Sequence, residues 1–176
     1  MFRPLPSLFV LLFTVASSVD AGAAEPQVIW PQGWIIESLP ADAPVPAKGP
    51  SRQRATKNDA SGNAVMVMEL TASPVEPDHL VNLQGVLLEM RKSIQKDFFQ
   101  GGYQSVCNKI HASVLGGASA LETTCTITQN GRHVLSQTLV AALNEGNAYV
   151  LSYAGQAQVF VESQDEIQSV RNSLKL

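Results

Sequence analysis

Residues 103–153 have the sequence YQSVCNKIHASVLGGASALETTCTITQNGRHVLSQTLVAALNEGNAYVLSY. The segment contains four runs rich in Val, Ile, Thr, Leu and Tyr, separated by turn signals at 115–117, 129–132 and 144–147. Short β-branched and aromatic runs between such turns predict strands joined by hairpins. We therefore expect one antiparallel sheet here, with the rest of the chain packed around it.

The strongest turn signal is Asn130-Gly131, because this pair tolerates the positive φ angles of a type I′ hairpin turn. A two-residue loop at that point sets the register of the flanking strands. The predicted opposite pairs are Ile127 with Val134, Cys125 with Ser136 and Leu121 with Val140. At the next turn, 144–147, Val140 is expected opposite Leu151 and Ala142 opposite Tyr149. Apolar residues fall on both faces of these strands, so we expect cover on both faces.

The register of the first hairpin is open. A three-residue loop at 115–117 sets Cys107 opposite Cys125, close enough for a cross-strand disulfide. The same register puts Val106 and Val114 on the face away from Leu121, whereas a shift of one residue aligns the apolar residues and separates the cysteines. A bulge near the glycines would satisfy both demands.

The two cysteines are most simply interpreted as one structural disulfide in a chain exported to an oxidising compartment. Closing the loop between Cys107 and Cys125 is worth roughly 3 kcal/mol in the chain-entropy model. A redox-active pair is the alternative, but the Cys-x-x-Cys spacing that lowers a thiol pKa is absent.

Residues 1–24 have the composition of a secretory signal, with Arg3 before a short apolar run and small residues at 21–24. The apolar run is too short to span a bilayer. The cleavage region also lacks the nearby cysteine that a lipid anchor would require. We therefore expect a periplasmic or secreted protein with a single domain over 25–176 and no stable membrane insertion. The formal net charge of −3 argues against a nucleic-acid partner.

Candidate binding residues lie between the signal segment and the first long strand. Trp30 and Trp34 are either an exposed stacking platform for a sugar or peptide, or a packed pair at the domain entrance. The proline-rich segment 39–50 is expected to be a surface loop, with a polyproline ligand as the alternative.

Segments 51–57 and 64–71 flank a turn at 58–63 and are predicted to form a hairpin. Arg52, Arg54 and Lys57 are expected to share one face of an edge strand. Such a stripe is usually a solvated edge that discourages aggregation, and anion binding is the functional alternative.

Two helices are predicted outside the meander. Residues 77–100 have apolar residues at three- and four-residue steps, with Pro77 suited to the first turn and Gly101-Gly102 to the end. A second helix is expected to start at Ser163, whose partner Glu166 completes a capping-box pattern.

No constellation of catalytic or metal-binding residues is visible in the sequence. The three histidines, His79, His111 and His133, lack metal-ligand spacing, and no nucleophile elbow, phosphate loop or dinucleotide fingerprint is present. We therefore expect no cofactor, no metal and no enzymatic activity.

The order of predicted elements resembles the PsbP-like fold, an α/β/α sandwich shared by the photosystem extrinsic protein PsbP and a yeast Ran-binding import factor. The elements that carry the resemblance are the entry at 33–35, the hairpin into 64–71, the long helix, the 148–153 strand and the closing helix with 170–176. More closely, the chain is similar to a family of small secreted bacterial proteins known only as a domain of unknown function. The resemblance implies an α+β fold with a mainly antiparallel sheet, one long helix and one C-terminal helix.

The resemblance also implies a non-enzymatic adaptor or accessory protein that binds another protein through sheet edges, loops or one face. It supplies no catalytic residue, and the cofactor and Ran sites of distant relatives have no matching motif here. We expect a monomer or weak dimer with an unknown protein partner.

Two alternatives stand beside this hypothesis. One is a small-ligand binder with a pocket between the long helix and the sheet, lined by Met66, Met68, Tyr149 and Tyr153. The other is a hydrolase whose site only the fold assembles.

Overall fold

The computed structural model describes residues 26–39 and 50–176. The predicted signal segment and nearly all of the proline-rich segment lie outside these residues. The described elements, in chain order, are β1 (Ile35–Leu39), β2 (Ser51–Asn58), β3 (Ala64–Pro74), α1 (Leu83–Gln100), β4 (Gln104–Cys107), β5 (His111–Leu115), β6 (Ala118–Gln129), β7 (Arg132–Asn144), β8 (Asn147–Gln156), α2 (Ala157–Glu162) and α3 (Gln164–Ser173).

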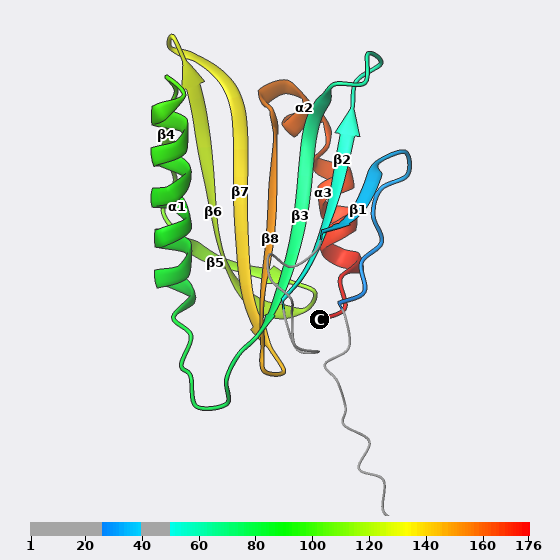
Figure 1. Cartoon of the computed structure of the whole chain (residues 1–176), viewed down its shortest axis with the longest axis vertical. Coiled ribbons are helices and arrows are strands. Elements are labelled where there is room, and N and C mark those ends of the chain that lie inside the picture. Colours follow the sequence, from blue (N-terminus) through cyan, green and yellow to red (C-terminus); the bar gives the residue numbers. More distant parts are fainter. Residues whose placement is uncertain (1–25, 40–49) are drawn as a thin grey trace, which may run out of the picture.

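The strands form one antiparallel sheet in the order β1-β2-β3-β8-β7-β6-β4, and β5 also pairs with β6. Helix α1 packs against β4, β6 and β7 on one face, while α2 and α3 lie on the other (Figure 1). This is the predicted helix–sheet–helix architecture with a mainly antiparallel sheet and one long helix. No helix of the described residues is long and apolar enough to cross a membrane.

The predicted registers are confirmed for one hairpin and corrected for another. Between β7 and β8, Val140 lies opposite Leu151 and Ala142 opposite Tyr149, as expected. Between β6 and β7 the turn is where Asn130-Gly131 placed it, with Gln129 opposite Arg132, but a bulge follows at Ile127/Thr128. The predicted pairs beyond the bulge are therefore wrong by one residue: Ile127 pairs with Leu135, Cys125 with Gln137 and Leu121 with Ala141.

The bulge has a packing reason. It places Leu121 and Ala141 together on the α1 face, whereas the predicted pairing would have joined Leu121 to Val140. Val140 belongs to the core on the opposite face, under α3. One extra residue thus lets both strands keep their apolar side chains under the right helix.

The segment before the first glycine turn is two strands instead of one. Cys107 lies opposite Cys125 and forms the predicted disulfide, whereas Leu115 lies opposite Ala118 across a two-residue turn. The register therefore changes by one residue between β4 and β5, and not near the glycines, where a bulge was one of the alternatives. Asn108 makes this break, because its side-chain oxygen accepts from the Thr124 amide at 2.8 Å and from the Thr123 hydroxyl at 3.1 Å.

One of the two predicted helix starts is wrong, and the other is confirmed. Helix α1 begins at Leu83, six residues after Pro77, because the Asn82 side chain caps it by accepting from the Gly85 amide at 3.0 Å. Its end at Gly101 is confirmed. At the C-terminal end, α3 starts at Ser163 as its N-cap, as expected, but a further short helix, α2, precedes it from Ala157, and the side chain of Ser163 makes no capping bond to α3. The predicted capping box is therefore absent.

The sheet separates two apolar cores. The larger joins β2, β3, β7 and β8 to Ile167 and Val170 of α3. The smaller places Leu87 of α1 over Leu139 and Ala141. The predicted pocket under the long helix is wrong, because its four lining residues belong to the core on the α3 side and are at most 4% exposed; they are Met66, Met68, Tyr149 and Tyr153.

Candidate functional site

The three basic residues of β2 do not share one face, and β2 is not an edge strand. Strand β1 pairs with the outer side of β2 and forms the edge. Arg52 and Arg54 lie two residues apart and both point to the α1 face. Lys57 lies three residues after Arg54 and therefore points to the α3 face. The structure thus divides the predicted stripe into two clusters, each with its own carboxylate.

On the α1 face, Glu69 of β3 holds both arginines. Its Oε1 accepts from Arg52 Nη2 at 2.8 Å, and its Oε2 accepts from Arg54 Nη2 at 2.9 Å. Burial acts to raise the pKa of Glu69, but the hydrogen bonds and charges of the two arginines outweigh it, so the pKa is lowered. The carboxylate therefore stays ionised and fixes the guanidinium groups.

On the α3 face, Lys57 donates to Glu166 Oε2 at 2.6 Å and to Ser163 Oγ at 3.1 Å. The indole Nε1 of Trp34 donates to Glu166 Oε1 at 3.2 Å. The Lys57 ammonium also lies 5.7 Å from the centroid of the Trp34 ring, within reach of a cation–π interaction. Burial again acts to raise the pKa of Glu166, but hydrogen bonds from Lys57 and Trp34 lower it overall. This cluster ties the edge of the sheet to α3.

The two tryptophans differ in exposure. Trp34 is buried at 7%, within the larger core. Trp30 packs partly buried against the same core, and its Nε1 donates to Gln53 Oε1 at 3.2 Å. Both rings are therefore engaged with the domain itself.

A third charged cluster was missed by the sequence analysis. Arg171 of α3 donates to Glu122 Oε2 at 2.9 Å, to Ser113 Oγ at 2.7 Å, to the Val114 carbonyl at 3.1 Å and to the Tyr153 hydroxyl at 3.1 Å. The Arg171 and Glu122 side chains are only 11% and 15% exposed. Burial is the main reason why the pKa of Tyr153 is raised. No spacing rule brings these residues together, since Glu122 and Arg171 lie 49 positions apart.

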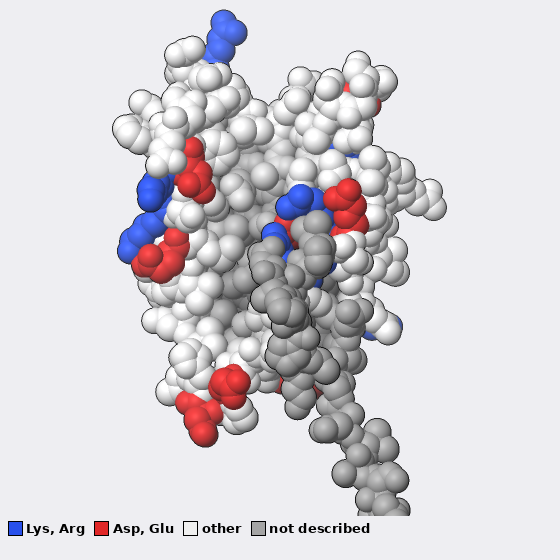
Figure 2. Space-filling model, in the orientation of Figure 1, with Lys and Arg blue, Asp and Glu red and all other residues white. Residues whose placement is uncertain are grey.

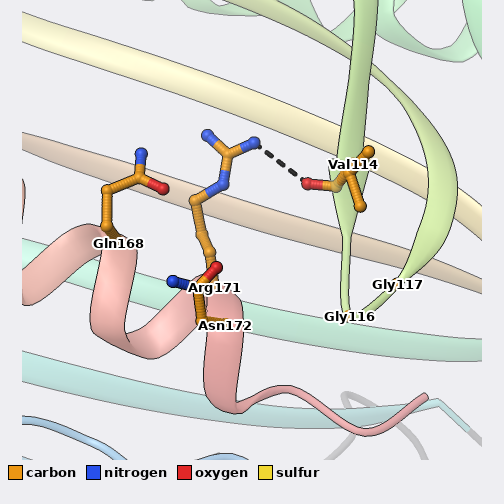
Figure 3. A pocket seen from close by; sticks show the side chains of 6 residues that line it. All are labelled: Val114, Gly116, Gly117, Gln168, Arg171 and Asn172. Atoms are coloured by element: carbon orange, nitrogen blue, oxygen red, sulfur yellow. Dashed lines mark hydrogen bonds between the residues drawn. The ribbon is translucent and has the colours of Figure 1, made fainter.

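Beside this cluster lies a pocket of about 380 Å³ between α3 and the β5–β6 turn (Figure 3). Three of its lining side chains come from one face of α3, and the turn contributes Val114 and two glycines. The lining residues are Val114, Gly116, Gly117, Gln168, Arg171 and Asn172.

The hydrolase alternative has one geometric feature in its favour, which its chemistry does not support. His133 Nε2 lies 2.9 Å from Ser136 Oγ, but it also lies 3.0 Å from the Leu135 carbonyl oxygen. A carbonyl oxygen only accepts, so Nε2 carries the proton and cannot act as the base for Ser136. Within residues 26–39 and 50–176, no group of three or more His, Cys, Asp or Glu side chains is arranged to hold a metal ion.

Helix α1 covers only half of its face of the sheet. It contacts β4, β6 and β7, while β1, β2 and β3 carry no helix on that face among the described elements (Figure 1). We call the outward residues there the open face: Ile35, Glu37, Arg52, Arg54, Thr56, Val67, Glu69 and Thr71. Ile35 is 51% exposed, and acidic and basic side chains gather on the β1–β2 side of this view (Figure 2).

Comparison with known proteins supports the fold. No curated protein matches the chain. Among solved structures, it is similar to PsbP (CyanoP) from the cyanobacterium Synechocystis sp. PCC 6803, with a TM-score of 0.59 and 14% identity over 92% of this chain and 98% of that one. It is also similar to LpqN, involved in cell envelope biogenesis of Mycobacterium tuberculosis, with a TM-score of 0.48 and 16% identity over 89% and 86%.

The likeness to PsbP confirms the predicted PsbP-like fold and, at this identity, shows the fold alone. The sequence itself carries the family assignment. A family model described as "Domain of unknown function (DUF4946)" matches residues 25–176. The chain therefore belongs to the DUF4946 family.

Proposed function

We propose that this protein is an extracytoplasmic, non-enzymatic accessory module that binds another protein through the open face. The observation that carries the proposal is the partial cover of the sheet by α1. Among the described residues, the face formed by β1, β2 and β3 carries no helix, whereas β4, β6 and β7 lie beneath α1.

The composition of the open face suits a protein partner. Ile35, Val67 and the methyl groups of Thr56 and Thr71 offer apolar contact, and all are at least partly exposed. Beside them lie the guanidinium groups that Glu69 holds in place. Protein interfaces combine an apolar centre with a polar rim and are enriched in arginine. The paired charges are already oriented, which lowers the entropic cost of binding.

The extracytoplasmic assignment draws on the disulfide and on the predicted signal segment. The Cys107–Cys125 bond is of the kind that persists in oxidising compartments. The composition of residues 1–24 is that of a secretory signal, which supports export from the cytoplasm. The charged clusters support a binding role over catalysis, because each carboxylate in them is committed to a cation of the same fold.

Two neighbouring isoleucines of β1 provide a matched test. Ile35 and Ile36 are 51% and 45% exposed, but they point to opposite faces of the edge strand. We expect the wild-type protein and I36K to capture the same partner from the extracytoplasmic fraction of the producing cell, and I35K to lose it. Both variants should keep the wild-type circular dichroism spectrum. Equal capture by I35K and the wild type would show that the open face is not the binding surface.

A further inference from the structure

The pocket between α3 and the β5–β6 turn lies on the α3 side of the sheet, away from the open face. Its volume of about 380 Å³ is within the lower range of small-ligand pockets. The two glycines at the turn have φ angles of +56° and +81°, so they form the tight turn that leaves backbone, not side chains, along this wall. The space is suited to a small ligand or to one unit of a larger one.

The polar groups of the pocket come mainly from one face of α3. Gln168, Arg171 and Asn172 are spaced three and four residues apart and therefore lie side by side, as Figure 3 shows. The side-chain amides of Gln168 and Asn172 take part in no hydrogen bond with the described residues. Each amide offers both a donor and an acceptor to a ligand.

The guanidinium of Arg171 is held before any ligand arrives. Three of its bonds, to Ser113, Val114 and Glu122, use Nη2, and the bond to Tyr153 uses Nη1. These contacts fix the plane of the group and leave its Nε–H without a partner among the described residues. A fixed donor next to two amides costs little ordering entropy on binding.

The charge of the pocket indicates a neutral ligand. Of the described residues that line it, Arg171 alone is ionisable, and Glu122 accepts from Arg171 at 2.9 Å. A ligand carboxylate would meet that compensated charge and could only accept hydrogen bonds, so it would leave both amide oxygens without a donor. Hydroxyl groups both donate and accept, so adjacent hydroxyls can satisfy an amide and the Nε–H together.

The wall opposite α3 is formed by backbone. Val114 turns its carbonyl oxygen to Arg171 and its side chain to the other face of β5, since its neighbour Ser113 reaches Arg171, and Gly116 and Gly117 carry no side chain (Figure 3). A sugar ring presents several hydroxyl groups side by side, and it can lie along such a wall without a side chain in its way. From this combination we propose that the pocket binds a neutral saccharide unit, either as a free sugar or as a residue of a longer glycan.

The proposal is tested by ¹⁵N-NMR titration of the protein with three probes: N-acetylglucosamine, its β-1,4-linked trimer, and acetate as the carboxylate control. We expect the sugars to shift the amide signals of Gly116, Gly117 and the 168–172 turn, with a dissociation constant of about 1 mM for the single sugar. Tighter binding of the trimer indicates a glycan as the natural source, and equal binding indicates a free sugar. Binding of acetate alone, or of no probe, overturns the proposal.

Variants of two exposed glutamines on α3 separate a site from a surface effect. Q168A removes an amide that lines the pocket, and Q164A removes one that lies one turn earlier, outside the pocket lining. We expect Q168A to weaken sugar binding about tenfold, as the loss of one to two hydrogen bonds implies, and Q164A to leave it unchanged. Equal weakening by the two variants, with both spectra otherwise native, would contradict the site.

Discussion

Arg171 illustrates how a single side chain joins three parts of this fold. It reaches from α3 to β5, β6 and β8, and it forms the most buried ion pair among those measured in the described residues. We expect R171M to lower the free energy of unfolding by about 3 kcal/mol, because the Glu122 carboxylate would remain buried without its cation. Urea denaturation measures the loss. K92M, which removes an exposed pair with Glu89, should cost less than about 0.5 kcal/mol; similar losses for the two variants would contradict this account.

Glu69 and Glu166 make stability depend on acid. Both have a pKa below the ordinary value of 4.5 in the folded protein. Below that value the unfolded chain binds more protons than the folded one, so stability falls as pH falls towards the folded pKa values. We expect the free energy of unfolding to be constant above roughly pH 6 and to decline below pH 4.5, with a shallower decline in E69Q/E166Q. Urea titrations across this range provide the test, and parallel curves for the two proteins would refute the assignment.

Two adjacent glycines separate backbone strain from steric clash. A Cβ on Gly116 would lie 2.7 Å from the Leu176 side chain and 2.9 Å from the Leu174 carbonyl oxygen, whereas one on Gly117 meets nothing within 4 Å. We expect G117A to cost about 1–2 kcal/mol from its positive φ alone. G116A should cost more, because it also displaces the C-terminal residues. Thermal unfolding of the two variants decides the matter, and equal costs would show that the C-terminus yields freely.

Strand β4 depends on its covalent link more than the other strands do. It has four residues at the edge of the sheet, and Cys107 joins it to Cys125 of β6 across 18 positions. We expect C107S/C125S to lose about 3 kcal/mol of stability in the chain-entropy model. Hydrogen exchange should speed up first in β4, since short edge strands open at low cost. Unchanged exchange in β4 would indicate that α1 alone holds the strand in place.

How far the sequence predicts each element depends on whether a local rule governs it. Asn130-Gly131 fixes its turn because of its own backbone preferences, and Gly101 ends α1 for the same reason. The bulge at Ile127/Thr128 follows no such rule. Residues 139–142 of β7 are all buried, so the alternation that normally sets register is missing there. Only the packing of α1 on one face and of α2 and α3 on the other decides which residues of β7 point to which face.

The charged clusters show the same limit across the whole molecule. Lys57 meets Glu166 across 109 positions, and the local pattern around Glu166 suggested a capping box instead. Composition identified Lys57, Arg52 and Arg54 as candidates. Strand alternation alone separates Lys57 from the two arginines, because it lies three residues after Arg54, whereas only the pairing of β1 outside β2 shows that β2 is not an edge strand. Arg171 and Glu122 gave no signal, because tertiary contact alone brings them together.

The arrangement of the helices over the sheet is the basis of the proposed function. Helix α1 lies over one half of its face, and α2 and α3 anchor the other face through the larger core (Figure 1). The open face is therefore a rigid platform, backed by buried residues such as Met68 and Leu70 of β3. Partners of such a platform need not deform the domain in order to bind.

Site-specific photo-crosslinking in the producing cell tests this account most directly. A photoreactive amino acid at position 35 reports on the open face, and the same residue at position 36 reports on the opposite side of the strand at similar exposure. We predict a discrete crosslinked protein from position 35 and none from position 36. A crosslink from position 36 alone, or from neither position, would contradict binding through the open face.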